Sequence, residues 1–179
     1  MSTYHHGDLP AALLRAAGRT LEKRGIAALS LRETARRAGV SHNAPYRHFP
    51  DREALLAALA AEGFAILGER LRGKPGREMS EAYVRFALEQ PQRFRLMFGG
   101  VLPLAKYPEL GTAAQGAYQA LGEAFKELSR PELAAAAAWS LVHGLSHLLL
   151  DGHFAGKDPA MFVQEVLAAV RFAATQRAA

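Results

Sequence analysis

The chain has 179 residues, of which half are hydrophobic and 22% are charged, a composition typical of a folded globular protein rather than a disordered one. It contains no cysteine, which excludes disulfides, thiolate metal sites and cysteine nucleophiles and favours a cytoplasmic location. The N-terminus lacks the apolar core of a signal peptide and no apolar run has the length of a membrane span, so we expect a soluble protein without a membrane partner.

Positive charge is concentrated at the N-terminal end of the chain. Residues 1–53 hold nine lysines and arginines against five acidic residues, so this part carries +4 of the total net charge of +5. The remainder of the chain is close to neutral. A compact basic segment joined to a neutral one favours a polyanionic partner for the basic segment alone, and nucleic acid is the first candidate.

Two helices are expected at the start of this basic segment. Asp8 is placed to cap a helix that begins at residue 9 and stops at Gly25. Ser30 followed by Glu33 has the pattern of a capping box, in which each residue satisfies a backbone N–H of the other. The helix that it starts is expected to end at Gly39, because glycine readily adopts the left-handed conformation of a C-cap.

A third short helix would complete a helix-turn-helix motif. Ser41 is placed to cap it, and Pro45 falls in its first turn, where we expect proline to be tolerated. The second helix of such a motif lies in the DNA major groove, where His42 and Asn43 would read base edges. The DNA backbone would be contacted by the other polar residues of the motif and its surroundings: Arg32, Thr34, Ser41, Tyr46, Arg47, His48 and Arg52.

The rest of the chain is also expected to be helical. Pro50 and Asp51 start a helix that continues to about residue 67, and the segment 72–76, with two glycines and a proline, is the clearest break. Further helical patterns cover residues 78–89, 92–98, 109–129, 131–151 and 158–174, and no strand alternation appears. We therefore predict an all-α fold with a three-helix, helix-turn-helix DNA-binding head, residues 1–52, and a helical-bundle body for ligand binding and dimerisation, residues 53–179.

The last two helical segments are strongly apolar. The first contains five successive alanines, residues 134–138, which let helices approach closely, and the second has one broad apolar stripe. Two copies of such a helix pair form a four-helix interface about a two-fold axis, whereas a folded monomer could also bury them. We predict a homodimer through these two helices.

The body contains residues suited to binding a small molecule. Four side chains follow one helix at four-residue steps: Trp139, His143, His147 and Asp151. Histidines one turn apart can bind a metal, but the glutamate of a zinc protease is absent between them, so we expect no metal and no cofactor. A polar contact in an effector pocket, or a contact in the dimer interface, is favoured instead. Aromatic and methionine residues would line this ligand-binding pocket or fill an ordinary core: Phe86, Phe94, Met97, Phe98, Tyr118 and Phe125.

Two stretches of the head resemble the TetR family of transcriptional regulators: LRETARRAGVS at 31–41 and YRHFPDREALL at 46–56. The body resembles one recurrent C-terminal type of that family, a WHG-like domain, through AYVRFA at 82–87, FRLMF at 94–98 and Trp139 followed by VHGL at 142–145. The resemblance implies a homodimer that binds a roughly palindromic double-stranded DNA operator, usually as a repressor that a small-molecule effector releases.

Three positions depart from the family's pattern. Thr34 stands where isoleucine or valine is usual, Pro45 replaces a large apolar residue, and Arg52 replaces lysine. Each of these residues is compatible with the fold, because Thr34 keeps a β-branched methyl group and Arg52 keeps its charge. They leave the operator sequence open.

Two other functions remain possible from the residues alone. One is a helical metal-dependent hydrolase that uses His143, His147 and Asp151, although no nucleophile and no phosphate-binding loop accompany them. The other is a dimeric helical interaction module whose head does not bind DNA. We expect a DNA-binding regulator and not an enzyme.

Overall fold

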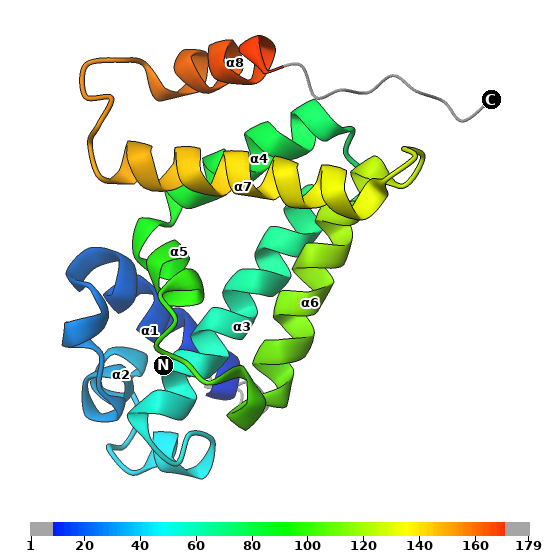
Figure 1. Cartoon of the computed structure of the whole chain (residues 1–179). Coiled ribbons are helices and arrows are strands. Elements are labelled where there is room, and N and C mark those ends of the chain that lie inside the picture. Colours follow the sequence, from blue (N-terminus) through cyan, green and yellow to red (C-terminus); the bar gives the residue numbers. More distant parts are fainter. Residues whose placement is uncertain (1–8, 171–179) are drawn as a thin grey trace. The chain divides into compact units, whose positions relative to one another are not determined.

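The structure is a computed structural model that describes residues 9–170. Within that range the regular elements are helices and no strand is present, as the sequence predicts (Figure 1). The α-helices are α1 (Leu9–Arg24), α2 (Leu31–Ala38), α3 (Arg52–Leu71), α4 (Gly76–Glu89), α5 (Pro91–Phe98), α6 (Pro108–Gly122), α7 (Pro131–Leu150) and α8 (Pro159–Ala169). Four 3-10 turns lie between them: η2 (Ile26–Ala28), η3 (Ala44–Arg47), η4 (Leu104–Lys106) and η5 (Glu123–Phe125).

The chain divides into two compact units. Of the described residues, the first unit contains 9–63 and 92–111, and the second contains 64–91 and 112–170. The first unit therefore combines α1, α2 and the first part of α3 with most of α5, which follows much later in the chain. The predicted boundary at residue 52 coincides with the start of α3, whereas the division between the two units falls after Gly63, inside that helix.

The ends of α1 and α2 follow the local signals in the sequence. Gly25 and Gly39 stop these helices with positive φ angles of 73° and 71°, a conformation that glycine adopts without a steric penalty. The Ser30 side chain accepts a hydrogen bond from the N–H of Glu33 at 3.1 Å, which is half of the predicted capping box. The other half is absent, because the Glu33 carboxylate is bound by arginines instead. The predicted Asp8 cap lies outside the described residues.

The prediction of a third α-helix capped by Ser41 is wrong, because residues 44–47 form only the 3-10 turn η3. In an α-helix capped at Ser41, residue 45 would be the first to donate its N–H to the Ser41 carbonyl. Pro45 has no N–H, and its ring would clash with that carbonyl. The chain tightens instead: the Ala44 N–H bonds to the Ser41 carbonyl at 3.0 Å, and the His48 N–H bonds to the Pro45 carbonyl at 2.9 Å.

Two glycines inside α3, which by propensity should weaken the helix, lie at close contacts within their units. A Cβ on Gly63 would be 2.6 Å from the Met97 sulfur of α5 in the first unit. A Cβ on Gly68 would be 3.4 Å from the Cα of Ala117 of α6 in the second unit. Both positions therefore favour glycine for packing, at the cost in helix propensity that glycine carries.

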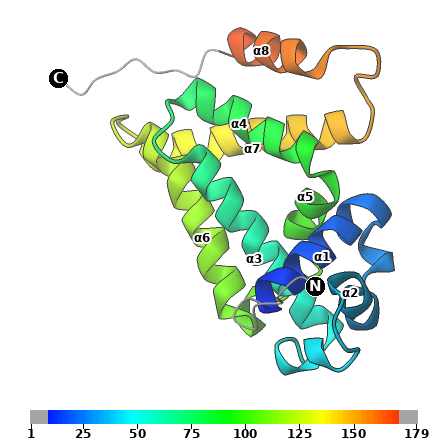
Figure 2. The ribbon, with the colours of Figure 1, turned by 180° about the vertical axis from the view of Figure 1, so that it is seen from behind.

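In the second unit, α4 packs against both α7 and α8, and Figures 1 and 2 show α4 crossing α7. The buried side chains of these helices include Tyr83 and Phe86 of α4 and Ala138 and Val142 of α7. The predicted helix over 109–129 is shorter than expected, since α6 ends at Gly122 and η5 follows it. The predicted Asp158 cap is present, with its carboxylate accepting the Met161 N–H at 2.9 Å, and residues beyond 170 lie outside the described range.

Helix α7 corrects the expectation that no apolar segment has the length of a membrane span. By length and composition alone it is apolar enough to cross a membrane, although such a test is also passed by core helices of soluble proteins. Only 28% of its most apolar window is buried inside the described part of the chain. Residues 9–170 of one chain thus leave much of the apolar surface of α7 uncovered.

Candidate DNA-binding surface and effector site

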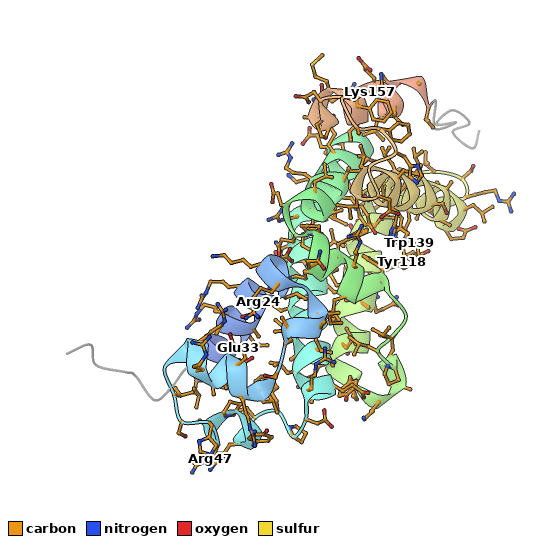
Figure 3. All side chains as sticks on the ribbon, turned by 90° about the vertical axis from the view of Figure 1, so that its left-hand side faces the viewer. Arg24, Glu33, Arg47, Tyr118, Trp139 and Lys157 are labelled. Carbon is orange, nitrogen blue, oxygen red and sulfur yellow. The ribbon has the colours of Figure 1, made fainter. Side chains whose placement is uncertain are left out.

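The turn η3 and the residues around it form an exposed polar surface on the first unit. Pro45 and Phe49 lie four residues apart, and both side chains are buried, so they attach the turn to the core of the unit. The side chains left at the surface are those predicted to contact DNA: Ser41, His42, Asn43, Tyr46, Arg47 and His48. Figure 3 shows Arg47 at the tip of this unit. The segment therefore presents the predicted side chains although it is not an α-helix.

Two arginines flank this surface, and their side chains have no partner among the described residues. Arg32 is exposed at the start of α2, and Arg47 is exposed at the end of η3. Neither side chain makes a hydrogen bond or an ion pair with any residue in the range 9–170. An exposed guanidinium of this kind is well suited to bind a phosphate oxygen or the edge of a guanine.

Two residues that we predicted to contact DNA have internal roles. Thr34 is 1% exposed, and its hydroxyl donates to the Ser30 carbonyl at 2.8 Å, which corrects the prediction that it approaches a phosphate. The Arg52 side chain donates from Nε to the Leu29 carbonyl at 2.8 Å and from Nη2 to the Ile26 carbonyl at 2.5 Å. Arg52 therefore connects the start of α3 to the turn between α1 and α2.

In the second unit, a hydrogen-bonded chain of three side chains connects α4 and α7. The Trp139 Nε1–H donates to the Tyr83 hydroxyl at 3.1 Å, and that hydroxyl lies 2.9 Å from Nδ1 of His143. Because an indole nitrogen can only donate, the Tyr83 hydroxyl accepts from Trp139, and the direction of its bond with Nδ1 depends on the tautomer of His143.

The surroundings of these side chains favour the neutral forms of His143 and Tyr83. Burial, followed by the nearby His147, lowers the pKa of His143, while burial raises the pKa of the Tyr83 hydroxyl. Along α7 the rings of His143 and His147 meet edge to face with centroids 4.7 Å apart, and the rings of Trp139 and His143 are tilted at 60° with centroids 5.9 Å apart. Tyr118 of α6 adds a fourth ring, 5.6 Å from Trp139 (Figure 3).

Tyr83 is the residue that sequence reasoning missed as a site residue. Its hydroxyl meets a histidine 60 positions later in the chain, and only the packing of α4 on α7 brings them together. No spacing within α4 signals this contact.

The predicted aromatic and methionine set is divided between the two units. Phe94, Met97 and Phe98 belong to the first unit, where the rings of Phe94 and Phe98 are 4.9 Å apart. Phe86 and Phe125 are buried in the second unit, with Tyr118 at its surface. Phe86 and Phe94 are fully buried and act as core residues, which is the simpler of the two roles that their composition allows.

Two hollows of the described residues lie elsewhere. One, of about 280 Å³, lies between α4 and the start of α8, next to Arg85 and Asp158. The other, of about 370 Å³, lies beside α3 in the first unit, next to His48 and Lys106. Neither is lined by the predicted effector-binding residues. Residues 9–170 also contain no group of three or more histidine, aspartate or glutamate side chains arranged to hold a metal.

The lowered pKa of His143 predicts a dependence of stability on pH. The folded chain holds the proton more weakly than the unfolded chain, so the contribution of neutral His143 is complete above the ordinary histidine pKa of about 6.5 and is lost as the pH falls below it. We expect the melting temperature to decrease as the pH is lowered from about 8 to about 5.5, and we expect His143→Asn to reduce this decrease. His153→Asn, which changes an exposed histidine, should keep the full pH dependence; an equal fall in all three proteins would contradict the prediction.

Two family descriptions match this chain. Residues 13–59 match bacterial regulatory proteins of the tetR family, and residues 77–170 match the tetracyclin repressor-like C-terminal domain. The first match covers α1, α2, η3 and the start of α3, and the second covers α4 to α8. None of the curated proteins matches the chain.

Several solved structures are similar over nearly the whole chain. A protein of unknown function from Rhodococcus sp. RHA1 is 33% identical, with 94% of this chain and 96% of that chain covered and a TM-score of 0.80. A tetR-family transcriptional regulator from Streptomyces coelicolor is 24% identical, with 96% and 81% covered and a TM-score of 0.74. The regulator FadR from Bacillus subtilis, solved with stearoyl-CoA, shares the fold at 15% identity, with 89% and 96% covered and a TM-score of 0.66.

Proposed function

Because the chain belongs to the TetR family of bacterial transcriptional regulators, we propose that it binds a palindromic operator as a homodimer and releases it when a small molecule binds. Members of this family are regulators and not enzymes, so the hydrolase hypothesis is set aside. We place the DNA-binding domain at residues 1–52, the effector-binding and dimerisation domain at 53–179, and the protein in the cytoplasm.

The observation that carries the DNA-binding part is the exposed surface around η3. Here His42 and Asn43 would read base edges, while Tyr46, Arg47 and Arg32 would hold the backbone. Buried Pro45 and Phe49 keep this surface in a fixed orientation on the first unit. A fixed surface loses little conformational entropy on binding, which supports a specific rather than a diffuse contact.

The homodimer is supported by uncovered apolar side chains on the last two helices. Leu133 and Leu148 of α7 are 48% and 43% exposed, and Met161 of α8 is 63% exposed. A second copy, placed by a two-fold axis against α7 and α8, would bury these side chains in a four-helix interface. A palindromic operator then follows from geometry, because two symmetric heads read two symmetric half-sites.

We place the effector next to the aromatic row of the second unit, at Tyr118, Trp139, His143 and His147, with Tyr83 added to the predicted set. The flat rings of these residues would contact an apolar molecule, and the imidazole of His143 would provide a polar contact to the effector. Other proteins of this fold were crystallised with ligands, namely FadR with stearoyl-CoA and the multidrug binding protein EbrR with imidazole.

A mobility-shift assay with the upstream sequence of the gene tests the proposal. We expect specific retardation that persists across a series of salt concentrations and exceeds that of a scrambled duplex. Absence of specific retardation from a properly dimeric protein would contradict the proposal and favour a helical interaction module without DNA binding.

The exposed positions of Tyr46 and Arg47 give a sharper test. Alanine at either position should weaken operator binding by about tenfold or more, with a change in unfolding free energy below about 1 kcal/mol, because both side chains are at the surface. Fluorescence anisotropy and urea denaturation measure the two quantities. Arg85→Ala, which removes an exposed arginine of α4, is the matched control and should leave affinity unchanged. Wild-type affinity in both variants would show that η3 does not face the DNA.

A further inference from the structure

One acidic residue of α2 binds three arginines of the first unit. The Glu33 carboxylate receives two bonds from Arg36, from Nε and Nη2, each at 2.8 Å. It receives a third from Arg37 Nε at 2.6 Å, and Arg24 of α1 lies 3.5 Å away. Figure 3 shows Arg24 and Glu33 on neighbouring parts of this unit. We call these four residues the Glu33 cluster.

The Glu33 cluster differs from the other arginines of the motif. Arg32 and Arg47 have no partner within residues 9–170, whereas the Nε atoms of both Arg36 and Arg37 are bonded to the same carboxylate. Two of the four arginines between residues 31 and 47 are thus paired internally. A count of charges alone would predict that all four arginines bind DNA.

The position of α2 makes this pairing relevant to DNA. In a helix-turn-helix motif the first helix crosses the DNA backbone while the second segment enters the groove. Arg36 and Arg37 occupy the last turn of α2, just before the Gly39 turn that leads to η3. Phosphates would therefore compete with Glu33 for these two guanidinium groups.

We propose that Glu33 sets the selectivity of this regulator for its operator, by withholding Arg36 and Arg37 from the DNA phosphates. Phosphate contacts strengthen binding to every sequence alike, whereas base contacts distinguish the operator. A head that keeps two cations occupied binds random DNA more weakly without losing its base contacts. The inference rests on the proposed DNA-binding function.

The test compares binding to a random-sequence duplex and to the operator over a series of NaCl concentrations. Glu33→Gln removes the charge, keeps the side-chain length and leaves the backbone N–H that Ser30 caps. We expect it to bind random DNA about three- to tenfold more tightly, with a salt dependence steeper by about one to two phosphate contacts. The ratio of operator affinity to random-DNA affinity should fall.

Arginine variants separate paired from unpaired cations. Arg32→Ala and Arg47→Ala should each make the salt dependence shallower by about one contact. Arg36→Ala and Arg37→Ala should leave it nearly unchanged. If these two variants lose as much salt dependence as the first two, the arginines leave Glu33 for the DNA and the proposal is overturned.

A second acidic residue controls for net charge. Glu69 of α3, in the second unit, also pairs with an arginine three residues later, Arg72. Glu69→Gln changes the net charge as Glu33→Gln does and should not alter random-DNA affinity. Equal effects of the two variants, or no effect of Glu33→Gln, would overturn the proposal. Failure of the wild-type protein to prefer its operator would instead contradict the proposed function itself.

Discussion

Met161→Glu should dissociate the homodimer and lower operator affinity by about two orders of magnitude or more. Met161 is 63% exposed on α8 in the single chain, and the proposed interface would bury it against the partner. A carboxylate buried there without a cation costs several kcal/mol, and about 3 kcal/mol already corresponds to about a hundredfold change in a dissociation constant. Light scattering across a dilution series measures the association, and anisotropy on the full operator measures the affinity.

The control for this prediction is Val101→Glu. Val101 is 62% exposed, nearly the same fraction as Met161, but it lies in the first unit between α5 and η4. The same charge at this position should leave both the dimer and the DNA affinity intact. Circular dichroism should show that the Met161→Glu monomer keeps its helices. If the Met161→Glu protein remains dimeric, the dimer interface does not include Met161 of α8.

Arg93→Ala should lower the free energy of unfolding by about 2 to 3 kcal/mol. The Arg93 guanidinium, 7% exposed as a residue, donates from Nη1 to Glu62 at 2.6 Å and to the Leu59 carbonyl at 3.2 Å. Breaking a buried pair by removing one partner costs about 3 to 5 kcal/mol, and we expect less here because Glu62 is partly exposed and can be rehydrated. Gly18 makes room for this side chain, since a Cβ there would be 2.7 Å from Nη2.

Urea denaturation of paired variants distinguishes a lost ion pair from a lost side chain. Arg93→Met combined with Glu62→Gln removes both charges and refills much of the volume, so it should be less destabilising than Arg93→Ala. Arg95→Ala changes an exposed arginine of the same helix and should cost less than about 0.5 kcal/mol. A double variant as unstable as Arg93→Ala would contradict this account, because no unpaired Glu62 charge would remain to explain the loss. Glu22, whose carboxylate accepts the N–H of Arg93 at 2.8 Å, should still hold the start of α5 in every variant.

Where the sequence prediction failed in the head, a single backbone or packing detail was responsible. Pro45 looked tolerable in a first helical turn, but it occupies the position whose N–H would close the first bond to Ser41. Thr34 looked like a polar surface residue, yet it lies on the same side of α2 as buried Leu31 and Ala35. Arg52 looked like a phosphate ligand, and backbone carbonyls 23 and 26 positions earlier hold it instead.

By itself the sequence determined the all-α fold, the limits of most helices and the exposed side chains around η3. These depend on interactions between residues at most four positions apart, such as the Ser30 cap and the left-handed Gly39, and local interactions can be read from a linear pattern. Tertiary structure alone decided that Tyr83 joins His143, that Arg93 reaches Glu62 and that α5 belongs to the first unit. Those contacts form between helices distant in sequence, and no periodicity within one helix records which side chain of another it will meet.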